Sequence, residues 1–506
     1  MTAQQPDPRR WLTLLAVMLA FLPVVLDMTI LHVAVPTLTQ DLRASANAVL
    51  WIIDIYPLLM AGLVVPMGTL ADKVGARKIL LLGLVVFGLA SALAAFSTSA
   101  GLLIAARGLL AMGGAMVMPS VLGIIRKTFE DDGERAMALG LWGTVGAAGA
   151  AVGPLIGGGL LAHFWWGSVF LVNVPVMLVV APACALLLPK GEATMPGRWP
   201  IGQALLLIAG MMLLVYGIKA GFGAKQPLPL IALIVLAGAA LLAIFVRWQL
   251  RSRTPMLDMT LFSHPAIVAG IIMAVVASGA LAGVELTLAQ ELQYVLGKTP
   301  LQAGFFMIPI MVAAALGGPV AGTLSNRFGL RSVACVSLLI AAACLGALGL
   351  SDFGEPGLAV PALLAVLGLT LSIGLTASSI AIMGSVEAAK GGAAGSLEAT
   401  SYELGTGFGI TIFGVFMSAV FAASIDLPPE LAPPLAEQAS RSIGDAFLVA
   451  HGMGGEEAAA LIGAAKRAFS QSHTALLSTA AMILAFLAVA VFFLLGSYRA
   501  RSSPAH

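Results

Sequence analysis

The sequence contains few charged residues. Asp, Glu, Lys and Arg make up 10% of its 506 residues, whereas a soluble globular protein carries about 25%, so an ordinary water-soluble enzyme is excluded. The 26 basic and 24 acidic residues nearly cancel, which excludes an electrostatic nucleic-acid binder. Hydrophobic residues make up 59% of the chain, so intrinsic disorder is excluded as well.

Cysteine and the common catalytic signatures are also scarce. The three cysteines, Cys184, Cys335 and Cys344, all lie in apolar runs, and an odd count argues against a disulfide framework. The sequence has no HExxH motif, no GxSxG motif and no clustered His/Cys ligands. A Walker A motif is missing too, because the string ending in Gly297-Lys298-Thr299 has Leu292 in place of its first glycine. We therefore expect neither an enzyme nor an ATP-driven pump, and no cofactor.

What the chain does have is long apolar runs. Fourteen of them reach the length of about 20 residues that a helix needs to cross a bilayer. They are continuous rather than alternating, which indicates helices and not barrel strands. The first run is too long for a cleavable signal peptide, and no A-x-A-like site follows it. The predicted fold is an all-α polytopic membrane protein with spans at 11–36, 47–71, 78–98, 101–125, 136–162, 167–189, 200–220, 227–247, 264–290, 301–324, 331–351, 358–384, 393–424 and 473–497.

The basic residues predict the orientation of these spans. With both termini in the cytoplasm, 18 of the 26 basic residues fall on the cytoplasmic side, seven fall outside and Arg107 lies within a span. Three of the seven lie in one long outer loop, 425–472, where the rule weakens. In that loop, apolar residues at helical spacing over 435–449 and 455–469 predict a helical hairpin lying over the outer mouth.

A short segment recurs in the two halves of the chain. Residues 68–78 read Gly-Thr-Leu-Ala-Asp-Lys-Val-Gly-Ala-Arg-Lys, and residues 322–332 read Gly-Thr-Leu-Ser-Asn-Arg-Phe-Gly-Leu-Arg-Ser. Both follow one apolar helix and precede another on the cytoplasmic side. Short Gly-and-Arg turns can recur by chance, but the identities at matching topological positions favour duplicated halves, a standard architecture of transporters.

The 68–78 segment resembles the signature loop of the major facilitator superfamily. Two spans more than twelve, lying between the halves, resemble its fourteen-helix drug:proton antiporter branch. Within the branch the chain looks most like bacterial exporters of quaternary ammonium biocides, methyl viologen and intercalating dyes. The segments that carry this resemblance are Leu26-Asp27-Met28-Thr29-Ile30 with Val33-Ala34-Val35-Pro36, Trp51-Ile52-Ile53-Asp54-Ile55-Tyr56-Pro57-Leu58, Arg107-Gly108-Leu109 and Glu398-Ala399-Thr400-Ser401-Tyr402-Glu403-Leu404-Gly405.

The resemblance implies two pseudo-symmetric six-helix bundles, residues 1–190 and 261–506, with an inserted helix pair at 191–260. It also implies a conformational latch in the signature loop, formed by Gly68, Asp72, Gly75, Arg77 and Lys78. We expect Asp72 to accept hydrogen bonds from a neighbouring helix N-terminus and Arg77 and Lys78 to find a cytoplasmic acid. Such a latch would stabilise the outward-facing state. The second copy has Asn326 at the Asp72 position, so the first copy is expected to carry most of the switching.

The fifth span resembles the antiporter motif of exporters through Gly149, Gly153, Pro154, Gly157 and Gly158. Gly149, Gly153 and Gly157 recur every four residues and form one bare stripe that permits close helix approach. Pro154 adds a kink because it lacks an N–H. We expect this stripe to form a contact between the halves that seals and releases, which is compatible with simple tight packing.

Three ionisable residues are predicted at a similar depth. Asp27 lies in the outer half of the first span, and Asp54 and Arg107 lie near the outer starts of the second and fourth, so all three are within about 10–15 Å of the outer boundary. A charge at the membrane centre costs about 2.5–3.5 kcal/mol, and an Asp–Arg pair would lower that cost. Asp27 is either permanently paired with Arg107 or, as its motif implies, a proton-coupling carboxylate; Asp54 is a coupling or an interfacial acid.

The thirteenth span supplies two more acids, Glu398 and Glu403. Five residues apart, they point about 140° away from each other, so at most one faces a central cavity. Glu403 is deeper and is the preferred cation or proton site; Glu398 is an entry-side contact or an interfacial acid.

Other ionisable groups in the spans are expected to play smaller parts. We expect Glu285 and Glu291 to be wetted at a helix end, Lys219 to sit at the outer end of its span, and His32 to pack or line the outer mouth. Four deep acids then face one deep base, Arg107. The interior is predicted to suit cationic cargo rather than anions.

Aromatic residues offer walls for such cargo, because quaternary ammonium groups bind over aromatic faces. Ordinary helix packing is the competing explanation for each of them. The candidates are Trp51, Tyr56, Trp142, Tyr402 and Phe408.

These observations predict a proton-coupled multidrug efflux antiporter for lipophilic cations, working by alternating access. We expect a multi-pass protein of the bacterial cytoplasmic membrane, monomeric, with membrane lipid, protons and cationic small molecules as its partners and no nucleic acid. A negative-inside potential favours proton entry by about 2.3 kcal/mol per charge per 100 mV. One alternative is a proton-linked uptake symporter, against which the fifth-span motif argues. Another is a non-transporting sensor or scaffold, which would not need four deep acids.

Overall fold

The computed structural model describes residues 9–129, 131–189, 199–223, 226–252, 255–386 and 391–497. Both chain ends and the predicted domain boundary at residues 190 and 191 lie outside these residues. Fourteen described helices are long and apolar enough to cross a membrane, as the sequence predicts. The helices are α1 (Arg10–Asp41), α2 (Ala46–Val74), α3 (Ala76–Ala95), α4 (Ala100–Thr128), α5 (Asp132–His163), α6 (Ser168–Leu171), α7 (Asn173–Leu187), α8 (Ile201–Gly223), α9 (Leu228–Arg251), α10 (Pro265–Gln290), α11 (Pro300–Phe328), α12 (Leu330–Gly349), α13 (Ala359–Met383), α14 (Gly391–Ser424), α15 (Pro433–Ala439), α16 (Ile443–His451) and α17 (Gly455–Leu494).

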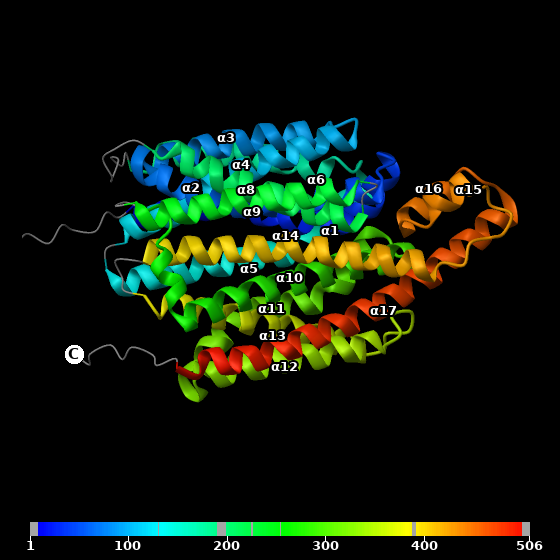
Figure 1. Cartoon of the computed structure of the whole chain (residues 1–506). Helices are drawn as coiled ribbons and strands as arrows, with labels where there is room; N and C mark the ends of the chain where they lie inside the picture. Colours follow the sequence, from blue (N-terminus) through cyan, green and yellow to red (C-terminus); the bar gives the residue numbers. More distant parts are fainter. Residues whose placement is uncertain are drawn as a thin grey trace, which may run out of the picture.

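The helices form one elongated bundle (Figure 1), and its buried side chains fall mainly into two large hydrophobic cores. One core is built mainly from α1 to α7 and the other mainly from α10 to α17. Helices α8 and α9 pack on each other, and α8 lies against α2. Most of α9 is exposed, including Leu233 and Leu236 at 63% and 66%, as expected of a helix that faces lipid acyl chains.

The two copies of the repeated segment fold into matching turns. Gly75 separates α2 from α3 with a φ of 107°, and Gly329 separates α11 from α12 with a φ of 81°. Only glycine adopts such angles without steric strain. The duplicated sequence therefore encodes the same helix–turn–helix junction in each half of the molecule.

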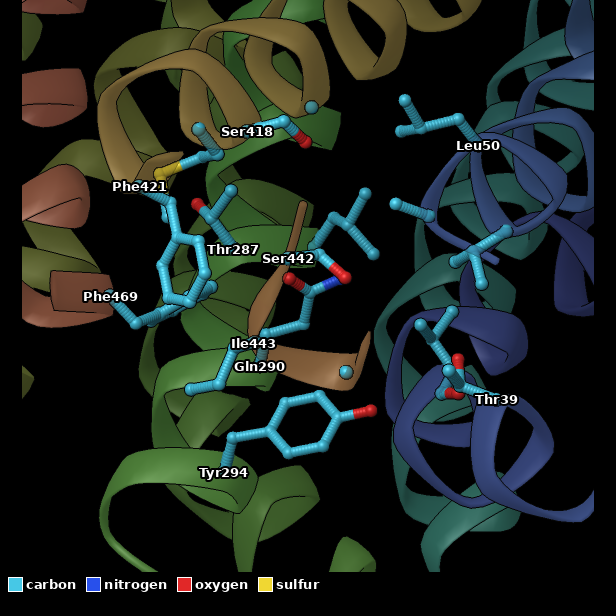
Figure 2. A pocket seen from close by; sticks show the side chains of 17 residues that line it. Thr39, Leu50, Thr287, Gln290, Tyr294, Ser418, Phe421, Ser442, Ile443 and Phe469 are labelled. Atoms are coloured by element: carbon cyan, nitrogen blue, oxygen red, sulfur yellow. The ribbon is translucent and has the colours of Figure 1, made fainter. Parts of the chain in front are cut away.

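The two ends of the bundle differ, and we name them by the Gly75 turn and by α16. Between the halves at the Gly75 end lies a cavity of about 340 Å³, lined by Gly68, Asp72, Arg126 and Ser396 among others. Between the halves at the α16 end lies a cavity of only about 70 Å³. Figure 2 shows Thr39 and Leu50 on one side of it and Thr287, Tyr294 and Phe421 on the other.

Close backbone contacts seal the halves together toward the α16 end. A Cβ added to Gly158 of α5 would lie 2.6 Å from Leu301 Cα of α11, and one added to Gly304 of α11 would lie 2.8 Å from the Pro154 carbonyl oxygen. Because no side chain fits these gaps, the bundle is closed at the α16 end and more open at the Gly75 end.

The long loop differs from its prediction in two respects, and the first is that the helix predicted over 435–449 is interrupted at residues 440–442. Its first part forms the short helices α15 and α16, which project at one end of the bundle (Figure 1). The segment predicted as a second hairpin helix is instead the start of α17, a single helix of 40 residues that includes the last span. The prediction of a break near residue 470 is wrong, because helical spacing continues unbroken from Gly455 into the span.

Helix α16 bridges the two halves, as the prediction of a segment over the mouth requires. The Ala46 backbone N–H, at the start of α2, donates to Asp445 Oδ2 at 3.4 Å, and the Ser442 hydroxyl donates to the same oxygen at 3.0 Å. Asp445 is 3% exposed. Burial raises its pKa, although these hydrogen bonds and the charge of Arg441 oppose that rise.

Candidate functional site

Arg107 of α4 joins three helices in the middle of the first half. It is 1% exposed, and its guanidinium donates to the Asp27 carboxylate of α1 and, from Nε, to the Ile52 carbonyl oxygen at 3.0 Å. The rings of Tyr56 and Phe170 lie 4.7 and 5.9 Å from the guanidinium carbon. The predicted proximity of Asp27 and Arg107 is confirmed.

The local backbone of α2 explains part of this arrangement. Pro57 has no N–H, so it cannot donate to the Ile53 carbonyl four residues earlier. Arg107 Nη2 lies 3.4 Å from that oxygen and donates to it instead. The proline thus leaves an acceptor inside the bundle, and the Arg107 side chain satisfies it.

Asp27 is not fully satisfied by Arg107. The carboxylate is 0% exposed, and its Oδ1 has no hydrogen-bond partner. A buried carboxylate oxygen without a donor is unfavourable. Asp27 is therefore both ion-paired at one oxygen and open to a proton or a donor at the other.

Asp54 of α2 has a different environment from the one predicted. Its carboxylate is 0% exposed and accepts from Lys219 Nζ of α8 at 2.8 and 2.9 Å and from the Thr411 hydroxyl of α14 at 2.7 Å. The interfacial interpretation of Asp54 is wrong. Lys219 lies near the C-terminal end of α8, as predicted, but it is only 4% exposed. The expectation that Arg107 is the lone deep base is therefore wrong.

Glu403 of α14 is a buried acid that has no fixed counter-charge among the described residues. Its side chain is 4% exposed, its Oε2 has no hydrogen-bond partner, and no described basic group lies within 4.0 Å of it. It lies close enough to Tyr56 to interact electrostatically with its hydroxyl, as do Asp27 and Arg107. Glu403 therefore faces the α1–α2–α4 cluster across the boundary between the halves.

Glu398 points elsewhere, as the predicted angle between the two glutamates requires. The Tyr402 hydroxyl lies 2.9 Å from Glu398 Oε1, 3.0 Å from the Leu375 carbonyl oxygen of α13 and 3.4 Å from the Ser378 hydroxyl. Glu398 is half-buried. Glu398 and Tyr402 therefore belong to the α13 side of α14, within the second half.

Two histidine–glutamate contacts were missed by the sequence reasoning. His32 Nδ1 of α1 lies 3.4 Å from Glu285 Oε2 of α10, and His473 Nδ1 of α17 lies 3.6 Å from Glu291 Oε2. Both glutamates are buried, at 8% and 4% exposure, so the prediction of wetted helix ends is wrong. The sequence did contain a signal for these contacts. Each histidine lies at about the same depth along its predicted span as its glutamate, near the outer end.

The predicted aromatic residues do not converge on one place. Trp51 lies beside Lys219, whose Nζ is 3.7 Å from the ring centroid, and Tyr56 lies beside Arg107. Trp142 packs on Phe21 with ring centroids 5.0 Å apart. Phe408 lines a separate cavity of about 130 Å³ among α10, α14 and α17.

The glycine stripe of α5 lies against α1, not against the second half. Cβ atoms added to Gly149 and Gly157 would lie 3.0 Å from Leu22 Cδ1 and 2.8 Å from Ile30 Cγ1, both in α1. The prediction that this stripe forms the contact between the halves is wrong. The residues of the motif that meet the other half are Gly158 and Pro154, one position removed from the stripe.

The signature-loop residues make contacts mostly within the first half. Gly68 and Asp72 line the cavity at the Gly75 end. Asp72 interacts electrostatically with Lys127 and Arg126 in the last turn of α4, so the expectation that it binds a helix N-terminus is wrong. Arg77 donates to the Ala185 carbonyl oxygen of α7 at 2.6 Å. The expectation that Arg77 finds an acid is therefore wrong, since a backbone oxygen at the end of α7 takes that place; Lys78 is exposed.

The described residues hold no group of three or more His, Cys, Asp or Glu side chains that could bind a metal.

Residues 17–409 match the sequence profile of the Major Facilitator Superfamily. The chain belongs to this family. It is accordingly a multi-pass membrane transporter and not an enzyme.

Curated relatives cover nearly the whole of this chain. The methyl viologen resistance protein SmvA of Salmonella typhimurium is 46% identical over 97% of this chain and 100% of its own length. The multidrug efflux pump LfrA of Mycolicibacterium smegmatis is 36% identical over 96% of each chain. The tetracenomycin C resistance and export protein of Streptomyces glaucescens is 33% identical over 81% of this chain and 76% of its own length.

A solved structure shares the fold. The inward-facing, unoccupied form of a bacterial homolog of the human lysosomal transporter Spinster superimposes with a TM-score of 0.68 over 99% of this chain and 100% of that one. The two sequences are 19% identical, so this likeness describes the architecture alone.

Proposed function

We propose that this transporter exports lipophilic organic cations in exchange for protons, by alternating access across the bacterial cytoplasmic membrane. The Gly75 end and both termini face the cytoplasm, and the α16 end faces outward. The protein works as a monomer without a cofactor. The single observation that carries the proposal is the buried Glu403, which no base in the described segments neutralises.

Glu403 is the proton carrier in this mechanism. A carboxylate buried without a counter-charge is strongly unfavourable unless a mobile positive charge binds it. A proton from the outer side or a cationic cargo from the cytoplasmic side can each meet that need, but not both at once. Competition for Glu403 therefore couples export of the cargo to entry of the proton. The Asp27 oxygen without a partner belongs to the same cluster of acids.

The buried charges favour cationic cargo. Among the described residues, the buried lysine and arginine side chains are those of Arg107 and Lys219, and each already contacts a carboxylate. An anionic cargo would find no available cation there, whereas Glu403 remains available to a positive charge. Two relatives, a methyl viologen resistance protein and a multidrug efflux pump, support the same class of cargo.

The shape of the bundle supports loading from the Gly75 end. That end has the larger cavity between the halves, and the α5–α11 contact at Gly158 closes the other. Proton loading or cargo release at the α16 end requires that contact to open. The Gly75 and Gly329 turns, which join consecutive helices in each half, stay on the loading side.

Transport in inside-out membrane vesicles tests the proposal. Vesicles containing the protein receive ethidium outside and an acid interior, without ATP. An exporter accumulates ethidium until a protonophore collapses the gradient, whereas vesicles without the protein do not. Failure to accumulate ethidium, tetraphenylphosphonium or methyl viologen under this gradient contradicts the proposal, and proton-driven loss of preloaded cation would instead indicate an uptake symporter.

A further inference from the structure

The contact between Asp54 and Lys219 has the composition of an organic-cation site. The Lys219 ammonium lies 3.7 Å from the Trp51 ring centroid and 2.8 Å from the Asp54 carboxylate. The ring of Tyr216 lies 6.0 Å from that of Trp51. An aromatic face beside a carboxylate, shielded from water, is the arrangement that binds ammonium ligands.

The site stands where the three parts of the chain meet. Asp54 and Trp51 come from α2 in the first half, Thr411 comes from α14 in the second half, and Lys219 comes from α8 of the helix pair between them. The Thr411 hydroxyl holds Asp54 Oδ2 at 2.7 Å. The carboxylate is thereby fixed in place independently of the lysine.

The two charged groups of this site come from different parts of the chain: Asp54 belongs to the first half, and Lys219 belongs to a helix outside the two halves. Both α8 and α9 lie along the outside of the bundle (Figure 1), and Tyr216 of α8 is 43% exposed. A lipophilic cation dissolved in the membrane can approach by this aromatic edge. A lysine displaced by it can extend its long side chain toward the membrane surface, as lysines near helix ends do.

We propose that Trp51, Asp54 and Tyr216 form a binding site for a lipophilic organic cation, and that Lys219 occupies this site as a tethered competitor. The cargo displaces the Lys219 ammonium from Asp54, and the return of Lys219 expels the cargo. The helix pair between the halves thus supplies a built-in counter-ion. This inference rests on the proposed function for the class of ligand, but it does not require proton coupling.

Equilibrium binding of tetraphenylphosphonium to the purified full chain in lipid nanodiscs tests this inference. Lys219→Met removes the competitor and is expected to bind at least tenfold tighter than the wild type at pH 8. Asp54→Asn combined with Lys219→Met is expected to lose that gain. Lys298→Met is the matched control, because Lys298 also lies near an aromatic ring, at 5.9 Å from Phe306, but holds no carboxylate.

A measurement on the unmodified protein covers the case in which Lys219→Met does not fold. Lys219 is 4% exposed, so it is expected to resist acetylation by acetic anhydride. Saturating tetraphenylphosphonium should raise acetylation of Lys219 severalfold, measured by mass spectrometry, and leave that of Lys298 unchanged. Unchanged acetylation of Lys219, or a folded Lys219→Met variant with wild-type or weaker affinity, overturns the inference. Proton-driven ethidium accumulation in wild-type vesicles would then still stand as evidence for the proposed function.

Discussion

Two buried acids in neighbouring helices, Asp54 and Glu403, have opposite surroundings. Asp54 accepts hydrogen bonds from a lysine and a threonine hydroxyl. In the described part of the chain no base lies within 4.0 Å of Glu403, and one of its oxygens has no hydrogen-bond partner. A buried carboxylate that has a fixed counter-ion stabilises the fold until a ligand displaces that counter-ion. A charge without one must be neutralised by a proton or by cargo. Burial alone therefore does not identify a coupling residue; a buried carboxylate that has neither a fixed counter-charge nor a hydrogen-bond donor for each oxygen does.

The largest effect should come from removing the acid that has no partner. Glu403→Gln keeps the shape and removes the charge, so gradient-driven ethidium accumulation should fall to the background of vesicles without the protein. Glu398→Gln is the matched control on the same helix, and because Glu398 accepts a hydrogen bond from Tyr402, it should retain at least a third of the wild-type rate. Equal losses in the two variants would contradict the distinction between the hydrogen-bonded Glu398 and Glu403, which keeps one oxygen without a partner.

The paired acid of the first half should instead matter for stability. Arg107→Met leaves Asp27 buried without its cation, which costs about 3–5 kcal/mol when one member of a buried pair is removed. Thermal unfolding in detergent should show a strong loss of stability. Adding Asp27→Asn to Arg107→Met removes the orphaned charge and should restore most of the stability; a double variant as unstable as Arg107→Met would contradict this account.

A smaller effect is expected where the halves touch. Gly158→Leu places a side chain against Leu301, so the α16 end can no longer close, and ethidium accumulation should fall by about tenfold. Gly159→Leu is the control one position along, because a Cβ there meets nothing within 4 Å. Spin-label distances between α5 and α11 should lengthen in Gly158→Leu and stay at wild-type values in Gly159→Leu. Unchanged distances in Gly158→Leu would contradict the assigned seal.

The smallest effect concerns the bridge made by α16. Burial raises the pKa of Asp445, so docked α16 holds a proton more readily than released α16. Docking should therefore be strongest below the ordinary aspartate pKa of about 3.9 and weaken as pH rises through the raised value. Spin labels on α16 and α2 should report this as a shift of about twofold in the docked population. Asp445→Asn should abolish the pH dependence, and a wild-type population that is flat or moves in the opposite direction would count against it.

Much of the fold follows from the sequence because the bilayer leaves few choices. A run of about 20 apolar residues must become a helix in lipid, so fourteen spans and the duplicated Gly75 and Gly329 turns were predictable. The Asp27–Arg107 pair was predictable too, because depth along each span brings the two groups to the same level.

Lateral packing was not predictable in the same way. The predicted positions of Lys219 and Asp54 along their spans put the two residues at a similar depth in the membrane. The sequence does not indicate, however, that α8 packs against α2 rather than facing lipid. The stripe of Gly149, Gly153 and Gly157 identifies a bare helix face without naming its partner, which is α1. The continuous α17 was missed because a polar helical stretch outside the membrane and an apolar one inside share the same period.

Proton release on cargo binding tests the central claim most directly. Tetraphenylphosphonium is added to the purified wild-type chain in weakly buffered nanodiscs, and the pH change is recorded with an indicator dye. The account predicts release of about one proton per bound cation in the wild type and none in Glu403→Gln, while Glu398→Gln releases as much as the wild type. Equal release from Glu403→Gln would show that the proton comes from another group and would contradict the assignment of Glu403 as the proton carrier.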